Sequence, residues 1–337
     1  MSKQNQPARI QDIAAIANVS VTTVSMVLNG NAQRYRIGKK TQEKIEKIAA
    51  ELSYSPNPSA RSLRNKTTQT IGLVISHLNN HFFTQLAGQL EQICRTNGYL
   101  LQISASEDDE VLEKELIQNF ISKSVDGLII ASVQKDSEHL IERVQGIPTV
   151  FIDREIEGDA QGWVGSNNQQ STDDLVTRLI SKAGEPREAA YIGGIKHLSS
   201  SKARLSGFKQ ALKRANIPFE RKVVIEEDYS IAAGNRSMQK LVQQLGRAPD
   251  VLFTASFTLL EGALPVLRQA LDSNPKTRSV IGTFDDHPLL DFVTPTIHSV
   301  RQDYSEIALS AFAQLKARFD GQSNVPAVVV PATLVIR

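Results

Sequence analysis

The stretch IQDIAAIANVSVTTVSMVLN, residues Ile10–Asn29, decides the fold of the amino-terminal part of the chain. Its apolar side chains have the spacing of the buried side of a helix, at Ile10, Ile13, Ala14 and Ala17 in a first segment and at Val24, Val27 and Leu28 in a second. Ser20, between the segments, is a good N-cap because its hydroxyl can accept from the free amides of the next turn. The pattern predicts a helix-turn-helix.

The outward face of the second helix carries small, uncharged side chains, at Val21, Thr22, Ser25, Met26 and Asn29. Side chains of this kind suit base edges and thymine methyl groups in the major groove of DNA. A third amphipathic helix follows, with outward lysines at Lys39, Lys40, Lys44 and Lys47. We therefore expect DNA binding; the alternative is an ordinary small helical bundle.

Charge is distributed unevenly along the chain, although its net value is only +2. Residues 1–66 contain eleven Lys or Arg and four Asp or Glu, whereas the remaining residues carry 27 basic and 32 acidic side chains. A basic end on an acidic body is typical of a nucleic-acid-binding module, because Lys and Arg neutralise phosphates. The alternative is a solvated lysine face without a nucleic-acid partner.

Length and composition limit the other possibilities. The chain has 337 residues and 41% hydrophobic residues, enough for a small module and one large or two medium domains. The single cysteine, Cys94, excludes an intramolecular disulfide and fits a reducing compartment. No apolar signal region begins the chain, and no run approaches a membrane span. We therefore expect a cytoplasmic protein with no membrane partner.

From Thr70 onward, apolar strand-like runs alternate with amphipathic helical segments. The strand-like runs include 71–75, 100–103, 127–131, 149–152, 189–192, 251–254 and 280–284. This rhythm predicts an α/β core of doubly wound parallel sheets. Its roughly 270 residues exceed one comfortable sheet, so we expect two lobes.

Polar and aromatic side chains follow several of these runs, at the sheet edge where ligands bind in such folds. They include Asn80, Phe82 and Phe83 after the first run, Asp153 and Arg154 after the fourth, Asp285 and Asp286 after the last, and Arg204 and Gln302 elsewhere. Carboxylates and guanidiniums hydrogen-bond the hydroxyls of a polyol, and aromatic faces cover its C–H side. The set predicts a polar small-molecule cleft. Adjacent strand-end positions point to different sides, so one of Asp285 and Asp286 should face it.

No catalytic or metal-binding set can be assembled from the sequence. The six histidines lack metal-ligand spacing, and Gly193-Gly194 is not a phosphate-binding motif. Ser199–Ser201 lacks the glycines of a nucleophile elbow. We therefore expect no enzyme activity, no metal and no cofactor.

The chain resembles the lactose-repressor (LacI/GalR) family of bacterial transcription regulators over essentially its whole length. The resemblance rests on DIAAIANVSVTTVSMVLNG (12–30), YSPNPSARSLRNKTTQTIGLVI (54–75), ARLSGF (203–208) and FDDHPLLDFVTPTIHSVRQD (284–303). It implies an all-α helix-turn-helix head and an α/β two-lobed core like the periplasmic sugar-binding proteins. The stretches LFTASFTLLEGAL (252–264) and GTFDDHPLLDF (282–292) resemble the sucrose-operon repressors and the related fructose repressors.

The resemblance assigns DNA contacts to the head and to a hinge. Ser20–Asn29 becomes the recognition helix, with Val21, Thr22 and Met26 reading bases and Ser25 and Asn29 supporting it at the backbone. In the hinge, Ala60 and Leu63 match residues that enter the minor groove, and Asn57 and Arg61 would hold phosphates. A helix over 58–64 is too short to be stable alone, so we expect it to form only when DNA or a partner holds it. The alternative is a plain flexible linker.

The resemblance also assigns the effector contacts. They are Asn80, Phe82, Phe83, Asp153, Arg154, Arg204, Ser256, Asp285 and Gln302. Two departures from the family pattern matter. Met26 stands where many members have arginine, so an apolar base contact replaces a guanine contact. Ser256-Phe257 replaces an Asn-Asp pair, which shortens one polar arm at the rim of the site and adds apolar surface.

We expect a homodimeric, sugar-responsive repressor of a sucrose or fructose utilisation operon, released from palindromic double-stranded DNA by fructose or a fructose phosphate. The alternatives are a regulator of another sugar or a purine, one that needs a co-repressor, and a sugar-binding transport protein. The expected domains are the head (1–54), the hinge (55–67) and the core (68–337). Within the core, one lobe takes about 68–165 and 301–328, and the other about 166–300 and 329–337.

Overall fold

The computed structural model of the chain describes residues 8–54, 67–135, 137–144, 146–156, 163–275, 277–322 and 324–337. It divides into two compact units, Met1–Thr68 and Gln69–Arg337, which we call the head unit and the core unit. Each is described by itself.

The head unit contains three short helices, α1 (Ile10–Ala17), α2 (Val21–Leu28) and α3 (Lys39–Glu51). The axes of α1 and α2 meet at 108°. Ile13, Val24 and Ile45, one from each helix, are fully buried in a common core. The helix-turn-helix predicted from the apolar spacing is therefore present, and the third helix closes its open side.

Local hydrogen bonds fix the ends of the first two helices. Asn18, in the turn, adopts the left-handed conformation with φ of 56°, which asparagine tolerates better than most residues. The hydroxyl of Ser20 accepts from the amide of Thr23 at 3.1 Å and so caps α2. Lys44 differs from the other lysines of α3, because its Nζ donates to the carbonyl oxygen of Ala17 at 2.9 Å. It ties α3 to the last turn of α1.

The first lobe of the core unit is built on a six-stranded parallel sheet with strand order β11-β5-β4-β3-β1-β2. Its strands are β1 (Thr70–Ile75), β2 (Leu100–Ala105), β3 (Gly127–Ile130), β4 (Thr149–Ile152), β5 (Trp163–Ser166) and β11 (Val328–Val330). Helices α5 (His81–Thr96) and α12 (Tyr304–Phe319) cover one face. Helices α6 (Glu110–Ser122) and α7 (Ser137–Val144) cover the other.

The second lobe repeats this plan with strand order β12-β10-β9-β8-β6-β7, in which only β12 is antiparallel. Its strands are β6 (Ala189–Gly193), β7 (Val224–Glu226), β8 (Val251–Thr254), β9 (Val280–Phe284), β10 (Ile297–Arg301) and β12 (Thr333–Val335). Its helices are α8 (Asn168–Ala183), α9 (Ser199–Arg214), α10 (Ile231–Leu245) and α11 (Phe257–Ser273), with the short turns η1 (Arg221–Val223) and η2 (Pro288–Asp291). The doubly wound two-lobed fold predicted from the sequence is confirmed.

Helices α10 and α11 approach each other closely because each has a glycine at the contact. A Cβ on Gly234 would collide with the carbonyl of Leu259, and one on Gly262 with the carbonyl of Ile231. The amino ends of both helices are thereby held near the edge of the sheet that faces the first lobe.

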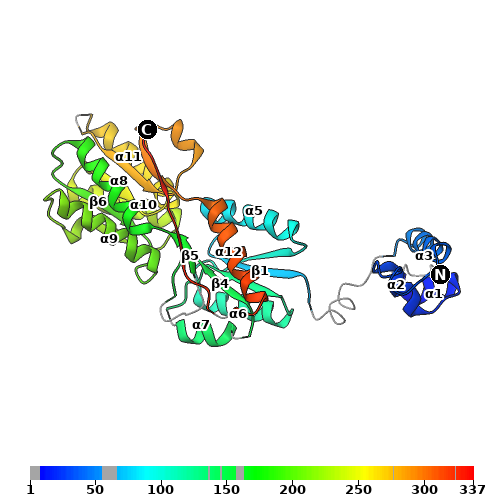
Figure 1. The fold of residues 1–337 in the computed structure, drawn as a ribbon. Coiled ribbons are helices and arrows are strands. Elements are labelled where there is room, and N and C mark those ends of the chain that lie inside the picture. The colour runs from blue at the N-terminus through cyan, green and yellow to red at the C-terminus, as the bar shows by residue number, and fades with distance from the viewer. Residues whose placement is uncertain are drawn as a thin grey trace. The chain divides into compact units, whose positions relative to one another are not determined.

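The chain crosses between the lobes three times, after β5, after β10 and after β11. Figure 1 shows the last crossing as the red segment that runs from the lobe of β1 to the lobe of β6. Asn167 joins two crossings, because its side-chain oxygen accepts from the amide of Ala332 at 2.8 Å. The lobes are thus linked by neighbouring segments beside a shared cleft.

Among the described residues, no individual helix is both long and apolar enough to span a membrane; the bent pair of α1 and α2 passes that test by length and composition alone.

Candidate functional site

The exposed surface of the recognition helix has the composition expected from the sequence. Ser20, Val21, Thr22 and Asn29 are exposed, while Ser25 and Met26 are half-buried. Asn29 bonds back to Ser25, donating from Nδ2 to its hydroxyl at 3.2 Å. No charged side chain belongs to this helix, so its face offers methyl groups and hydroxyls.

The four hinge residues Asn57, Ala60, Arg61 and Leu63 lie outside the described residues. Their assigned contacts with DNA therefore stay predictions from the sequence.

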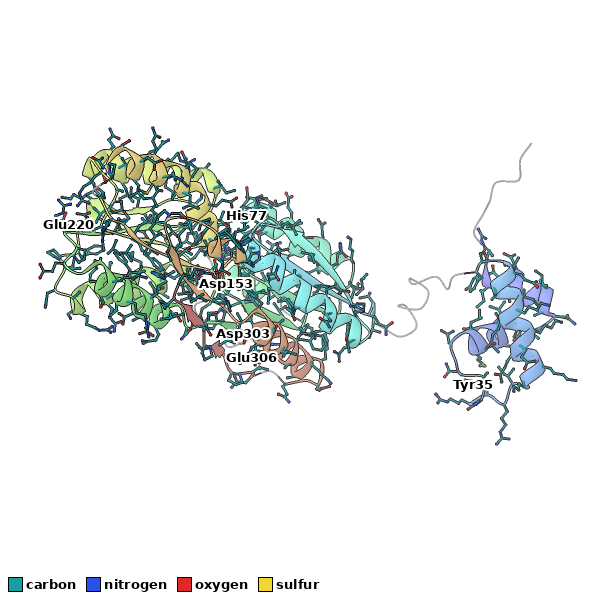
Figure 2. The ribbon with its side chains drawn as sticks, turned by 90° about the horizontal axis from the view of Figure 1, so that it is seen from above. Tyr35, His77, Asp153, Glu220, Asp303 and Glu306 are labelled. Carbon is teal, nitrogen blue, oxygen red and sulfur yellow. The ribbon has the colours of Figure 1, made fainter. Side chains whose placement is uncertain are left out.

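A cleft between the two lobes of the core unit brings together all nine residues assigned to the effector. Its lining consists of Ser76, Asn80, Phe82, Phe83, Asp153, Arg154, Ser200, Arg204, Tyr229, Ser256, Asp285 and Gln302, and we call this set the cleft. Figure 2 shows Asp153 in the interior of the core unit and Glu220 far from it on the second lobe. The lining side chains leave a cavity of only about 20 Å³ between them.

Arg204 is fixed on the second-lobe side of the cleft and is only 4% exposed. Its Nε donates to the side-chain oxygen of Asn168 at 2.7 Å, and its Nη1 donates to the carbonyl of Ala255 at 2.7 Å. Its guanidinium carbon lies 3.8 Å from the centre of the Phe284 ring. These contacts hold a planar cation in one orientation, which suits it to directional hydrogen bonding.

Arg154 is fixed on the first-lobe side and is 3% exposed. Its Nη1 donates to the carbonyl of Ser132 at 3.3 Å, and its Nη2 donates to Asp108 at 2.8 Å. His77 lies within hydrogen-bond distance of the same carboxylate, with Nε2 3.2 Å from Asp108 Oδ2. Asp108 and His77 do not line the cleft, but they set the position of a residue that does.

The charge of Asp108 is maintained by these partners. Burial opposes ionisation, but the Arg154 guanidinium and the hydrogen bond from His77 outweigh it and lower the pKa of Asp108. The hydrogen bond to Asp108 in turn raises the pKa of His77, against the effect of burial. The three residues form a coupled network.

Asp285 and Asp286 face different sides, as adjacent strand-end positions should. Asp285 lines the cleft and accepts from Nε2 of Gln302 at 2.7 Å, while Gln302 accepts from the hydroxyl of Ser166 at 2.6 Å. Asp286 accepts instead from Ser299, at 2.6 Å, and from the guanidiniums of Arg301 and Arg337. Asp285 also links the cleft, through Gln302, to the crossings between lobes.

Two buried polar atoms in the cleft have no hydrogen-bond partner within the described part of the chain. They are Oδ1 of Asp153 and Nε of Arg154. Asp153 lies 3.8 Å from both Arg154 and Arg204, which is an ion-pair distance beyond hydrogen-bond range. Burial raises the pKa of Asp153 and of Asp285, although Arg204 opposes the shift in both. A ligand with hydroxyl groups would satisfy atoms that otherwise cost free energy.

Two other residues of the cleft, Asn80 and Ser256, are positioned as N-caps of helices. The side-chain oxygen of Asn80 accepts from the amide of Phe82 at 3.0 Å and caps α5, and the hydroxyl of Ser256 accepts from Leu259 at 3.2 Å and caps α11. The predicted site residues Asn80 and Ser256 therefore have a structural role as well as a place in the lining.

Sequence reasoning did not assign Ser76 or Tyr229 to the cleft. Ser76 directly follows β1, a strand-end signal that could have found it. Tyr229 precedes α10, and its hydroxyl lies 2.8 Å from that of Ser201. No local motif marks Tyr229; its ring reaches the cleft because Gly194, which contacts it, has no side chain.

Comparisons with known proteins agree with this division of the molecule. Residues 9–57 match the family described as "Bacterial regulatory proteins, lacI family", and residues 71–323 match "Periplasmic binding protein domain". The chain belongs to the lacI family. It is therefore a transcriptional repressor with a DNA-binding head and a core of the periplasmic-binding-protein fold.

Several relatives in this family regulate sugar operons. The chain is 36% identical over 331 residues to the sucrose operon repressor of Klebsiella pneumoniae, with 97% of each chain covered. It is 32% identical over 306 residues to the fructose operon regulatory protein of Vibrio cholerae, covering 90% of this chain and 92% of that one. The crystal structure of the Cra transcriptional dual regulator of Pseudomonas putida, in complex with fructose 1-phosphate, matches with a TM-score of 0.72 at 31% identity. That match covers 80% of this chain and 98% of the other.

Within the described residues, no group of three or more His, Cys, Asp or Glu is arranged to hold a metal ion.

Proposed function

We propose that this lacI-family member is a homodimeric, sugar-responsive repressor of a sucrose or fructose utilisation operon, released from DNA by fructose or a fructose phosphate. The observation that carries the proposal is the pair of unpartnered buried atoms, Asp153 Oδ1 and Arg154 Nε, in a cleft that also presents Arg204, Asp285 and Gln302. Carboxylates and guanidiniums fixed around aromatic side chains are a suitable environment for a polyol.

The charges of the cleft favour an uncharged fructose. Within the described parts of the chain, the carboxyl groups of Asp108, Asp153 and Asp285 interact with two guanidiniums, those of Arg154 and Arg204. A phosphate would bring further negative charge to a site whose cations already have carboxylate partners. A fructose phosphate stays the second candidate, because the Cra regulator similar to this chain was crystallised with fructose 1-phosphate.

On the DNA side, Val21, Thr22 and Met26 would contact bases, with Ser20, Ser25 and Asn29 supporting the helix. Asn57, Ala60, Arg61 and Leu63 would form the hinge contacts. Two heads of a dimer would occupy the two half-sites of a palindrome. Because the recognition face is apolar and hydroxylic, thymine methyl contacts would outnumber guanine hydrogen bonds.

The proposed response is a population shift. Sugar in the cleft would favour a lobe arrangement in which the hinges no longer hold DNA. Linkage then requires sugar and operator to weaken each other's binding by the same factor. A differential binding free energy of a few kcal/mol is enough for such a switch.

A groove on the second lobe supports the proposed dimer. It is lined by Leu264, Pro265, Leu267, Arg268, Phe292, Val293, Thr294 and Pro295. Phe292 is 84% exposed, an unusual state for so large an apolar side chain. A contiguous apolar surface of this kind is typical of a protein interface.

The proposal includes the absence of enzyme activity. Its rivals are regulation by another sugar or a purine, and a co-repressor that strengthens operator binding instead of weakening it. Calorimetric titration with fructose, fructose 1-phosphate, sucrose and adenine separates the ligands. Electrophoretic mobility shifts with a palindromic operator, with and without the ligand that binds, give the sign of the response. Binding of adenine alone would contradict the sugar assignment, and detectable turnover of a sugar would contradict the non-enzyme assignment.

A further inference from the structure

Four aromatic side chains join the two lobes along one flank of the cleft. They are His81 on α5 and Tyr304 on α12, from the first lobe, and Phe257 on α11 and His287 after β9, from the second. We call them the ring bridge. The rings of His81 and His287 have their centres 4.4 Å apart across the lobe boundary.

Contacts within each lobe hold the ring bridge in place. His287 stacks on Phe257 with ring centres 4.5 Å apart and planes 9° from parallel, and its Nδ1 accepts from the amide of Leu289 at 3.1 Å. Tyr304 lies 6.3 Å from His81 and 5.8 Å from Phe82, centre to centre. The rings of the bridge are therefore held in place by contacts within their own lobes.

The ring bridge directly adjoins the cleft. His81 stands between the lining residues Asn80 and Phe82, Phe257 follows Ser256, and His287 lies two residues after Asp285. A ligand that contacts Asn80, Ser256 and Asp285 would meet the bridge immediately beyond them.

The opposite flank, on the α6 side of the first sheet, is closed by backbone groups of the first lobe that bond side chains of the second. The carbonyl of Val133 accepts from Nε2 of His197 at 2.9 Å, and the side chain of Val133 is buried in the core of the second lobe. The buried Glu113 accepts from the amide of Val133 at 2.7 Å and braces this contact. The backbone of Glu155 also donates across the boundary to Ser199, at 2.7 Å.

We propose that the ring bridge sets an upper size limit on the effector, so that the cleft takes a monosaccharide and rejects a disaccharide. This inference rests on the proposed function, that the effector is a sugar. The side chains of the cleft leave a cavity of only about 20 Å³, and cross-lobe contacts close both flanks. A monosaccharide would have to displace lining side chains, and a disaccharide, roughly twice as large, would also have to separate either the rings or the Val133 contact. The ring contact is made by side chains of both lobes, so a substitution on either lobe can remove it.

The experiment is calorimetric titration of the full-length protein with fructose, fructose 1-phosphate, ribose and glucose, and with sucrose and maltose. We expect wild-type protein to bind at least one monosaccharide and to bind both disaccharides at least about a hundredfold more weakly. In the His81→Ala/His287→Ala variant, we expect this ratio to narrow by at least about tenfold, mainly through tighter disaccharide binding. His139→Ala, on an exposed part of α7, is the matched control and should keep the wild-type ratio. The single variant His81→Ala preserves the test if the double variant does not fold.

Each outcome decides a separate point. Equal binding of a disaccharide and a monosaccharide by the wild type would overturn the size limit. An unchanged ratio in folded bridge variants would overturn the assignment to the ring bridge. If ribose or glucose bound instead of fructose, with both disaccharides rejected, the fructose assignment would fail and the size limit would stand. Failure of every sugar to bind would overturn both.

Discussion

Asp108 accepts a hydrogen bond from Arg154 across 2.8 Å, and both side chains are buried. Arg154 donates from Nη2 to Asp108 and from Nη1 to the carbonyl of Ser132. Nε has no partner in the described structure and stays available to a ligand. Asp108 therefore determines which edge of Arg154 faces the cleft without lining the cleft itself.

Asp108→Asn should weaken sugar binding by about tenfold, or roughly 1.4 kcal/mol, because the amide cannot match the charge that orients Arg154. Calorimetry of the full-length protein measures the change. Asp109→Asn is the matched control: Asp109 caps α6 through Val111 and Leu112, and asparagine caps equally well. Equal losses in the two variants would show that general charge, rather than the Arg154 contact, is responsible.

Arg204→Ala should abolish the sugar response and leave operator binding intact. It also leaves Asp153 and Asp285 with one guanidinium fewer, so we expect destabilisation of about 3 kcal/mol. Arg204→Lys keeps the charge but loses the paired contacts to Asn168 and Ala255, and should also fail to respond. Mobility shifts with increasing sugar test both, with the exposed Arg178→Ala as control. A normal sugar response in Arg204→Ala would place the effector elsewhere.

The stability of the core should depend on pH through His77. Its pKa is raised above the ordinary 6.5, so the folded chain holds this proton more tightly than the unfolded chain. The His77 contribution to the free energy of unfolding is therefore complete below pH 6.5 and is lost as the pH rises through the raised pKa. Because His77 is partly exposed, we expect less than about 1 kcal/mol.

Burial lowers the pKa of His81 and of His298, so these two residues change the stability with pH in the opposite direction. Comparing the thermal unfolding of wild type and His77→Gln at several pH values therefore isolates the contribution of His77. The difference between the two proteins should be largest in mild acid and shrink in alkali. A difference that grows with rising pH would contradict the assignment.

Ser20 should separate head stability from DNA binding. Ser20→Ala removes the cap on α2 and should destabilise the head by about 1 kcal/mol, while Ser20→Asp restores the cap. The aspartate adds a negative charge at the DNA-facing end, so this variant should stay folded and still bind operator poorly. Circular dichroism melts and mobility shifts give the two readouts. Poor folding of Ser20→Asp would show that the hydroxyl has a different role.

Phe292→Asp should convert the proposed dimer to monomers at micromolar concentration, because it places a charge on the apolar groove of the second lobe. Sedimentation velocity gives the oligomeric state. Phe219→Asp, at another exposed phenylalanine of the same lobe, is the control and should stay dimeric. A dimer that survives Phe292→Asp would move the interface elsewhere.

Much of the fold could be predicted from the spacing of apolar residues in the sequence. Long helices such as α10 are identified by their apolar stripe, and short fully buried runs such as β8 by their length and their β-branched and aromatic residues. The strands β7, β11 and β12 have three residues each, too few to establish an alternation. They exist because neighbouring strands offer them hydrogen bonds.

Part of the cleft could also be predicted from the sequence. Asp153 and Asp285 stand immediately after β4 and β9, and Asn80 lies in the loop between β1 and α5. The parallel topology therefore places each residue at the carboxyl edge of its own sheet. Tyr229 and Asp108 act through tertiary contacts with residues distant in the sequence, and nothing local distinguishes them. The ring bridge is of the same kind: its four members come from four separate segments, and only the closure of two lobes unites them.

The three crossings have a consequence for synthesis on the ribosome. The first sheet gains its last strand, β11, and α12, one of the two helices on the face that α5 also covers, only after the entire sheet of the second lobe except β12 has been made. Apolar residues of β1, β3 and β4 on that face therefore wait for a partner helix that emerges more than two hundred residues after β1. We therefore expect the nascent first lobe to expose its apolar surface for longer during synthesis than the second lobe does.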